Sequence, residues 1–164
     1  MADLFHRVSI RKYQDRPVER EKIVEILRAA MAAPSAKNQQ PWEFYVVKRR
    51  ETIEALSQAS PYAGAAAGAP LVFVVAYREA VTAPELTAVD CAIATENMWL
   101  ALEGLGLGGV MMAIAPDEER MEKTRAALGL PAGVVPFCLL PIGYPAEKRP
   151  QQDRYDAGKI HTIA

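Results

Sequence analysis

Residues 85–109 read ELTAVDCAIATENMWLALEGLGLGG, and this stretch decides the fold. At helical spacing its apolar residues lie almost all the way round the axis: Ala88, Val89, Ala92, Ile93, Met98, Trp99, Leu100 and Leu102. Such a helix is buried on more than one side. Its small residues, Ala88, Cys91, Ala92, Ala94 and Ala101, would let another backbone approach closely. We therefore predict that one face packs on a sheet and another on a second helix, from the same chain or from a partner chain.

The glycines at the end of this helix, Gly104, Gly106 and Gly109, have the G-x-G-x-x-G spacing of dinucleotide-binding proteins. That motif works only where it follows a strand and opens a helix, whose N-terminus then holds the pyrophosphate. Here the order is reversed, because the glycines close a helix and lead into an apolar stretch at 110–115, predicted as a strand. The sequence therefore argues against a Rossmann dinucleotide site.

Helices and strands alternate on both sides of the central helix, and proline and glycine separate them. We predict helices over 18–33, 50–58 and 116–128, strands over 44–48, 71–77 and 137–142, and loops over 34–42 and 60–70. With about four strands this is an α/β or α+β domain, and the pattern leaves the strand directions open. A chain of 164 residues suits a single domain over 1–164.

The composition limits the classes of partner. A net charge of -1 with 24% charged residues gives no general attraction to nucleic acid or to an anionic membrane. The longest uncharged segments are broken by proline and glycine, which is not typical of a membrane span. No basic segment with a following apolar stretch opens the chain, so we expect a cytoplasmic protein. Cys91 and Cys138 lie in apolar runs without metal-ligand spacing, so both are predicted to be small buried hydrophobic residues.

Two local clusters carry enough polar groups to bind a ligand. In the first, RVSIRKY at 7–13, arginine forks and a serine hydroxyl suit a phosphate, although a solvated basic surface has the same pattern. In the second, PSAKNQQPW at 34–42, the polar side chains fit a ligand with several heteroatoms, or an ordinary turn anchored by Trp42. The pattern alone leaves both alternatives open.

Motifs for side-chain catalysis are missing from the sequence. There is no P-loop, no nucleophile elbow and no metal-binding set, and the two histidines, His6 and His161, lie at opposite ends. We therefore predict no catalytic side chain and no metal ligand. Either the protein is not an enzyme, or a cofactor carries the chemistry.

Four stretches in order carry a resemblance to a known family. They are RVSIR at 7–11, PSAKNQQPW at 34–42, TENMWLA at 95–101 running into LGLG at 105–108, and IGYP at 142–145 followed by DRY at 153–155. Together they resemble the FMN-dependent nitroreductase family in its short single-domain form, over nearly the whole chain.

That resemblance implies an α+β fold, an α/β/α sandwich whose mixed, largely antiparallel sheet is flanked by helices. It also implies an intertwined homodimer with FMN at the interface. Under this resemblance the basic cluster is an anion site. One group of residues would hold the FMN phosphate and the atoms near it: Arg7, Val8, Ser9, Arg11 and Arg154. A second group would reach FMN from the other subunit: Pro34, Ser35, Ala36 and Asn38, with Gln40 shaping the loop. Met112 and Ala113 would pass the flavin ring.

The implied activity is a ping-pong cycle. NADH or NADPH reduces FMN and leaves, and a nitroaromatic, quinone or similar acceptor then binds where the nucleotide was and is reduced. Two positions depart from the family: Met111 or Met112 stands where an aromatic residue is frequent, and Gln152 where a basic one is frequent. The alternatives are a specialised chemistry, such as reductive dehalogenation or flavin fragmentation, and a flavin-binding protein without turnover. The polar tail over 148–164 must lie on a surface, a ligand or a neighbouring subunit.

Overall fold

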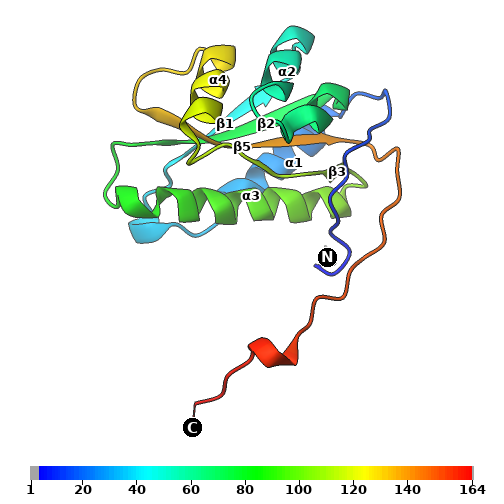
Figure 1. Ribbon diagram of the computed structural model, residues 1–164, viewed down its shortest axis with the longest axis vertical. Helices are drawn as coiled ribbons and strands as arrows, with labels where there is room; N and C mark the ends of the chain where they lie inside the picture. The colour runs from blue at the N-terminus through cyan, green and yellow to red at the C-terminus, as the bar shows by residue number, and fades with distance from the viewer. Residues whose placement is uncertain (1–3, 164) are drawn as a thin grey trace.

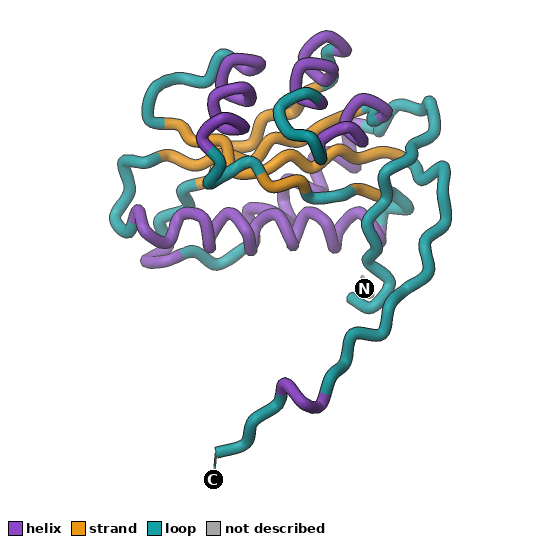
Figure 2. Tube along the Cα trace, viewed as in Figure 1, coloured by secondary structure: helices purple, strands orange, loops and turns teal. Residues whose placement is uncertain are grey.

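The computed structural model describes residues 4–163, so the ends of the expected domain, 1–3 and 164, lie outside the described residues. The chain forms three layers, with a sheet in the middle (Figures 1 and 2). One face is covered by α1 (Arg20–Met31) and α3 (Thr87–Gly104), the other by α2 (Arg50–Ser57), α4 (Glu118–Leu128) and a 3-10 helix, η2 (Ala63–Gly68). This arrangement confirms the predicted α/β/α sandwich.

The sheet consists of β1 (Trp42–Val47), β2 (Leu71–Arg78), β3 (Gly108–Gly109), β4 (Met112–Ala113) and β5 (Val134–Gly143). Its order is β1-β2-β5-β3, and β4 also pairs with β5. All of these pairings are antiparallel, and a parallel bridge joins Ser9 to Gly109. The prediction of a largely antiparallel sheet is therefore confirmed.

Strand β2 shows how the sequence builds both cores at once. Successive side chains of a strand point to opposite faces, so Phe73 and Val75 pack with α1 and α3 while Val72 and Val74 pack with α2. Because both faces are covered, residues 71–76 are all buried. Cys138 on β5 and Cys91 on α3 are free and buried, as predicted.

The central helix, α3, is covered on one side and open on the other. Its inner face, which includes Cys91, Ala94, Met98 and Leu102, is buried against the sheet and α1. On the outer face Val89 is 54% exposed and Ile93 is 36% exposed. The predicted packing on a sheet and on a second helix is therefore met by the sheet and α1, while the outer face has no cover within the described residues.

The glycines after α3 end the helix, as predicted. Gly106 has a φ of 67°, a conformation that glycine adopts without a side-chain penalty. The amide of Gly106 donates to the Glu103 carbonyl at 3.1 Å, and that of Leu107 to the Leu102 carbonyl at 2.9 Å. This pair of bonds is the Schellman motif, so the glycines serve as a helix cap rather than a dinucleotide loop.

The single strand predicted over 110–115 is wrong. Two separate two-residue strands are present, β3 opposite Gly143 and Ile142 and β4 opposite Leu139 and Cys138. The break between them is a property of pairing with β5, so periodicity within residues 110–115 could not reveal it. It raises the strand number from the expected four to five.

Residues 12–14 run beside residues 144–146, with an antiparallel bridge between Tyr13 and Pro145, before the tail leaves the body (Figures 1 and 2). Residues 148–163 are all exposed, with Tyr155 at 77% and Ile163 at 97%. Strand β1 has no neighbouring strand on its outer side within residues 4–163. Of the helices in this part of the chain, none is both long and apolar enough to span a bilayer.

Candidate functional site

The N-terminal segment is fixed along β3 by one shared carbonyl. The Gly109 carbonyl accepts the amide of Ile10 at 2.9 Å and the indole Nε1 of Trp99 at 3.1 Å. A side chain at Gly108 would place its Cβ 2.6 Å from Ile10, so only glycine permits this close approach. Residues 7–11 are thereby held in one position relative to α3 and the sheet.

Beside this segment lies a groove of about 1000 Å³, here called the arginine groove. Its lining includes Arg7, Val8, Ser9, Arg11, Arg149 and Arg154. The structure therefore brings together the predicted residues near the start of the chain and the predicted arginine of the tail. Arg149, which also lines it, was not singled out from the sequence.

Arg7 is the most enclosed cation of the arginine groove, with a side chain 17% exposed. Its guanidinium carbon lies 4.1 Å from the centroid of the Trp99 ring, a cation–π geometry. Its Nε is 3.9 Å from Oε1 of Glu96. Its Nη1 is buried and has no hydrogen-bond partner among the described residues. An unpaired buried donor costs about 1–3 kcal/mol, so this atom favours the arrival of an acceptor.

Glu147 organises the other side of the groove. Its Oε1 accepts the amides of Arg11 at 2.6 Å and Lys12 at 3.2 Å, and its Oε2 accepts Nε of Arg149 at 2.9 Å. The hydrogen bond from the Arg11 amide, followed by the contact with Arg149, holds the pKa of Glu147 below its ordinary value. Arg149 is thus paired with a carboxylate, and the other arginines that line the groove are Arg7, Arg11 and Arg154.

Gln152, at the position where the family frequently has a basic residue, contacts Arg154. Its Oε1 accepts Nη2 of Arg154 at 2.6 Å, so it orients that arginine without adding a charge.

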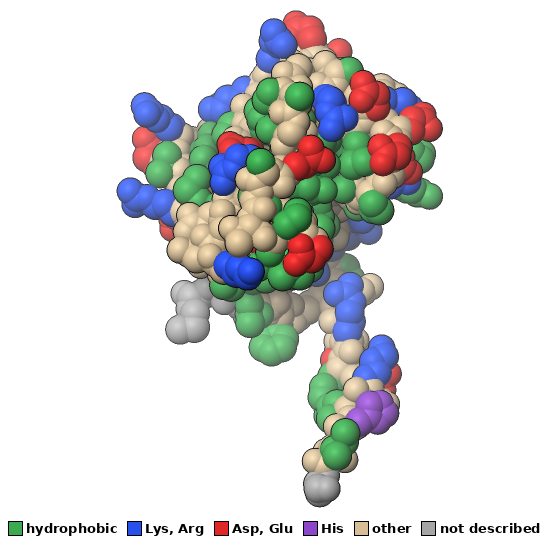
Figure 3. All heavy atoms as spheres, turned by 90° about the vertical axis from the view of Figure 1, so that its left-hand side faces the viewer, with side chains coloured by type: hydrophobic (Ala, Val, Ile, Leu, Met, Phe, Trp, Pro, Cys, Tyr) green, Lys and Arg blue, Asp and Glu red, His purple; other side chains and the backbone are tan. Residues whose placement is uncertain are grey.

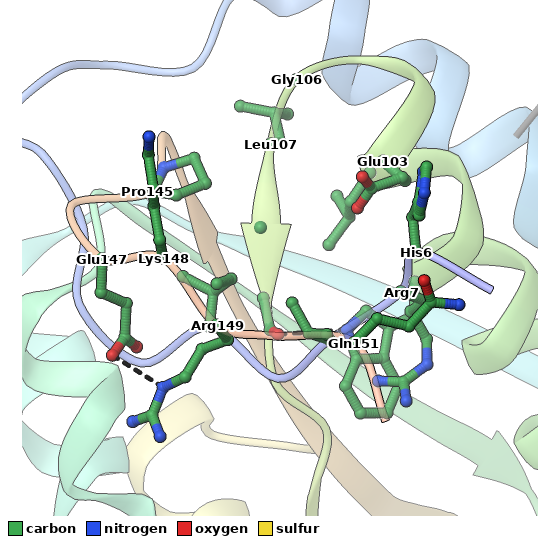
Figure 4. Close-up of a pocket in the computed structure, with 16 residues that line it drawn as sticks. His6, Arg7, Glu103, Gly106, Leu107, Pro145, Glu147, Lys148, Arg149 and Gln151 are labelled. Atoms are coloured by element: carbon green, nitrogen blue, oxygen red, sulfur yellow. Dashed lines mark hydrogen bonds and ion pairs between the residues drawn. The ribbon is translucent and has the colours of Figure 1, made fainter. Parts of the chain in front are cut away.

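A second groove of about 440 Å³, here called the glycine groove, is also lined by Arg7. In Figure 4, Lys148 and Arg149 of the tail lie on one side and His6 and Arg7 on the other, with Gly106 and Leu107 between them. Glu103 and Glu147 also line it, so its charges are mixed. The glycine groove shares Arg7 and Arg149 with the arginine groove and lacks a cluster of cations of its own.

The loop at 34–42 is held in a strained conformation. Lys37, Asn38 and Gln40 have φ values of 50°, 53° and 44°. For Lys37 and Gln40 this left-handed conformation costs roughly 1–2 kcal/mol each, whereas asparagine adopts it more readily. Hydrogen bonds within the loop offset part of this cost, from the Gln40 amide to Ser35 Oγ at 3.0 Å and from Gln40 Nε2 to Asn38 Oδ1 at 2.9 Å.

Asp90 of α3 anchors this loop, a role that the sequence analysis missed. The carboxylate accepts the Ala36 amide at 2.9 Å and Nε2 of Gln39 at 2.7 Å. Asp90 is 3% exposed, although it lies on the otherwise small or apolar inner face of the helix. A carboxylate at such a position was the signal available in the sequence, because a buried charge requires partners.

The loop and the arginine groove lie at different places along α3. None of residues 34–40 lines either groove described above. The loop contacts Asp90, whereas Arg7 contacts Glu96 and Trp99. At 1.5 Å per residue these contacts are about 9 and 13 Å further along the helix axis. Within one chain, the two predicted halves of the site do not meet.

Met112 and Ala113 form β4, away from both grooves. Met112 is buried in the core shared with α2, while Ala113 is exposed and its carbonyl lies 3.5 Å from Nη1 of Arg120. Their predicted contact with the flavin ring therefore stays a prediction. Among residues 4–163 there is also no group of three His, Cys, Asp or Glu side chains that could hold a metal ion.

Comparison with known proteins identifies the family. Residues 4–61 and 56–144 match the family model described as Nitroreductase. The chain belongs to the nitroreductase family. A Methanothermobacter thermautotrophicus protein with the provisional name NADH dehydrogenase/NAD(P)H nitroreductase is 42% identical over 156 residues, covering 94% of this chain and 82% of that protein.

Solved structures of nitroreductases have the same fold. An FMN-dependent nitroreductase of Clostridium difficile superposes with a TM-score of 0.92 at 30% identity, covering 98% of this chain and 97% of that one. A provisionally named nitroreductase of Desulfovibrio desulfuricans, crystallised in complex with FMN, gives a TM-score of 0.83 at 28% identity. The alignment covers 97% of this chain and 93% of that one.

Proposed function

We propose that this chain is an FMN-dependent NAD(P)H oxidoreductase that acts as a homodimer. The observation that carries the proposal is the convergence of Arg7, Ser9, Arg11 and Arg154 on one groove, although the sequence separates the first from the last by most of the chain. Three guanidinium groups and a hydroxyl suit a terminal phosphate. A similar structure that contains FMN and relatives named for NAD(P)H support the choice of cofactor and reductant.

The residues present fit FMN on chemical grounds. Nη1 of Arg7 is a buried donor that has no hydrogen-bond partner among the described residues, and a phosphate oxygen would accept its hydrogen bond. Arg11 and Arg154 are exposed along the same groove and would complete the charge on the phosphate, with Ser9 as a neutral donor. Val8 would contribute an apolar wall. When bound, FMN supplies the redox chemistry, accepting hydride from NADH or NADPH and reducing a nitroaromatic, quinone or similar acceptor.

In this assignment the protein binds and orients rather than reacts. No side chain is assigned to general acid or base catalysis. Residues 34–36, Asn38 and Gln40 would present polar groups to the cofactor of the partner subunit, and the backbone of Met112 and Ala113 would flank the flavin ring.

Three features support a dimer. The loop at 34–40 and the arginine groove lie apart within one chain, so a complete site needs both subunits. The outer face of α3 leaves Val89 and Ile93 exposed. The tail projects from the body, with Ile160 59% exposed and Ile163 97% exposed (Figure 3). Apolar surface of this kind is typical of an interface.

The test begins with natively purified protein. It should absorb in the flavin range and release FMN, not FAD, on denaturation. Under anaerobic conditions NADH or NADPH should bleach the flavin, and a nitroaromatic or a quinone should restore its colour. A colourless protein that takes up no FMN would refute the assignment.

The same experiment separates the alternatives. Flavin that NADH and NADPH both leave unbleached would indicate a flavin-binding protein without turnover. Bleaching followed by reoxidation only with halogenated aromatics, or by loss of the flavin itself, would indicate one of the specialised chemistries. Stopped-flow rates with both nucleotides and a panel of acceptors identify the preferred substrates.

A further inference from the structure

The strained loop at 34–40 has an anchor outside itself. Its left-handed residues, Lys37, Asn38 and Gln40, are not glycines, so their conformation requires support from the surrounding structure. Asp90 provides it, with Oδ1 on the Ala36 amide at 2.9 Å and Oδ2 on Nε2 of Gln39 at 2.7 Å. Asp90 thus holds the loop on both sides of Lys37 and Asn38.

Gln39 fixes the direction of this anchor. Its Oε1 accepts the Ala83 amide at 2.8 Å, while its Nε2 donates to the Ala83 carbonyl at 3.0 Å and to Asp90. The side-chain amide of Gln39 cannot rotate by 180°, because its NH₂ would then face the amide of Ala83 and its oxygen would face the Asp90 carboxylate. The carboxylate at position 90 therefore has to accept from both the loop backbone and Gln39.

We infer that Asp90 is a positioning residue for the FMN site, acting through the loop at 34–40 rather than by touching the cofactor. The inference rests on the proposed function, which sets this loop against the arginine groove of the other subunit. In one chain Arg7 contacts α3 at Glu96 and Trp99, whereas Asp90 lies earlier in the same helix and holds the loop, so the two would serve different FMN molecules. Each FMN site then needs the Arg7 of one chain and the Asp90 of its partner.

The first experiment is Asp90→Asn in the dimer. An asparagine can accept the Ala36 amide, but its NH₂ then faces the NH₂ of Gln39, so the anchor is lost on one side. We expect FMN affinity to fall about tenfold or more, as for the loss of a charge-assisted hydrogen bond. Fluorescence titration measures the affinity, and hydrogen exchange at residues 36–40 should become faster.

Asp117→Asn is the matched control. Asp117 also accepts a backbone amide, that of Arg120 at 3.0 Å, but it caps α4 on the opposite face of the sheet. It should leave FMN affinity unchanged even if stability falls. Gln39→Ala is the second variant, for the case in which Asp90→Asn does not fold. It leaves the hydrogen bond from the Ala36 amide to Asp90 in place. We expect it too to lower FMN affinity and to make hydrogen exchange at residues 36–40 faster.

The second experiment mixes subunits. A dimer of one Arg7→Ala chain and one Asp90→Asn chain, separated by two affinity tags, would contain one doubly altered site and one unaltered site. We expect it to bind one FMN with the affinity of the unaltered protein. A mixed dimer with no such site would overturn the sharing of Arg7 and Asp90 between subunits.

The outcomes distinguish this inference from the proposed function. If the unaltered protein takes up no FMN, the proposed function itself fails. If the unaltered protein binds FMN and Asp90→Asn binds it equally well, the positioning role is wrong, whether or not exchange at 36–40 becomes faster.

Discussion

Arg154 is the cation of the arginine groove that depends least on the rest of the fold, because it lies on the exposed tail beside Gln152. Arg154→Ala should weaken FMN binding about ten- to a hundredfold, since it removes one charge-assisted hydrogen bond. Excess FMN should restore turnover, because a phosphate contact is remote from the redox centre. Arg154→Lys should restore binding only in part, since a point charge cannot replace a planar fork.

Fluorescence titration with FMN, followed by turnover at saturating FMN, measures both effects. Lys159→Ala is the control, because Lys159 is a tail cation that pairs with Asp156 and lines neither groove described above. A variant at Arg154 that binds FMN normally would remove this residue from the phosphate site. One that binds FMN without turning over would place Arg154 near the substrate instead.

Glu147 makes the arginine groove sensitive to acid. Its pKa is lowered in the folded protein, chiefly by the amide of Arg11. The ionised carboxylate therefore stabilises the folded protein, and this stabilisation is fully present above the ordinary pKa of 4.5. The stabilisation is lost as the pH falls through the lowered value. Between pH 7 and pH 3 the urea midpoint should therefore fall less in Glu147→Gln than in the unaltered protein. Glu51→Gln, at an exposed position on α2, is the control; an equal fall in both variants would contradict this role.

At the scale of elements, the cap of α3 offers a matched pair of glycines. Gly106 has a φ of 67° and free space around it, so Gly106→Ala should cost roughly 1–2 kcal/mol of stability from conformation alone. Gly104 is the last helical residue, also with free space, so Gly104→Ala should leave stability unchanged or raise it by up to about 1 kcal/mol. Urea unfolding of both variants measures the difference, and equal effects would argue against the cap.

The same elements show what the sequence could and could not predict. The helix predicted over 18–33 is observed as α1, two residues shorter at each end, between Pro17 and Pro34. The break between β3 and β4 was missed, since it depends on the register of β5, a strand that begins about twenty residues later.

The candidate site was predicted unevenly for a similar reason. Arg7, Ser9, Arg11 and Arg154 belong to local motifs, and the structure places them together. Asp90 stands out in the sequence as a carboxylate on a small or apolar helix face, but its partner Gln39 is 51 residues away, and no local pattern pairs the two. The positive φ values of Lys37, Asn38 and Gln40 could not be predicted from the sequence either, because left-handed positions are usually inferred from glycine.

For the whole molecule, the proposed dimer places the open face of α3 at the interface between subunits. Val89→Glu places a charge in the centre of the proposed interface, where burial without a partner is costly. Sedimentation at micromolar concentration should show a dimer for the unaltered protein and a monomer for the variant. Ala126→Glu, at an exposed position on α4 across the sheet, should remain dimeric. An unaltered protein that is monomeric, loaded with FMN and active would contradict the dimer.

Strand β5 lies inside the sheet, yet of the sheet's five strands it is the last to be synthesised. It pairs with β2, β3 and β4, so until residues 134–143 have been made β2 has only β1 beside it, and β3 and β4 lack their strand partner. On the ribosome, a nascent chain that stops short of this segment can complete β1 and β2 but not the sheet. Its buried faces stay open to chaperones and to aggregation during most of translation. The sheet therefore cannot form in full until β5 has been made, and slow codons before β5 would lengthen this interval.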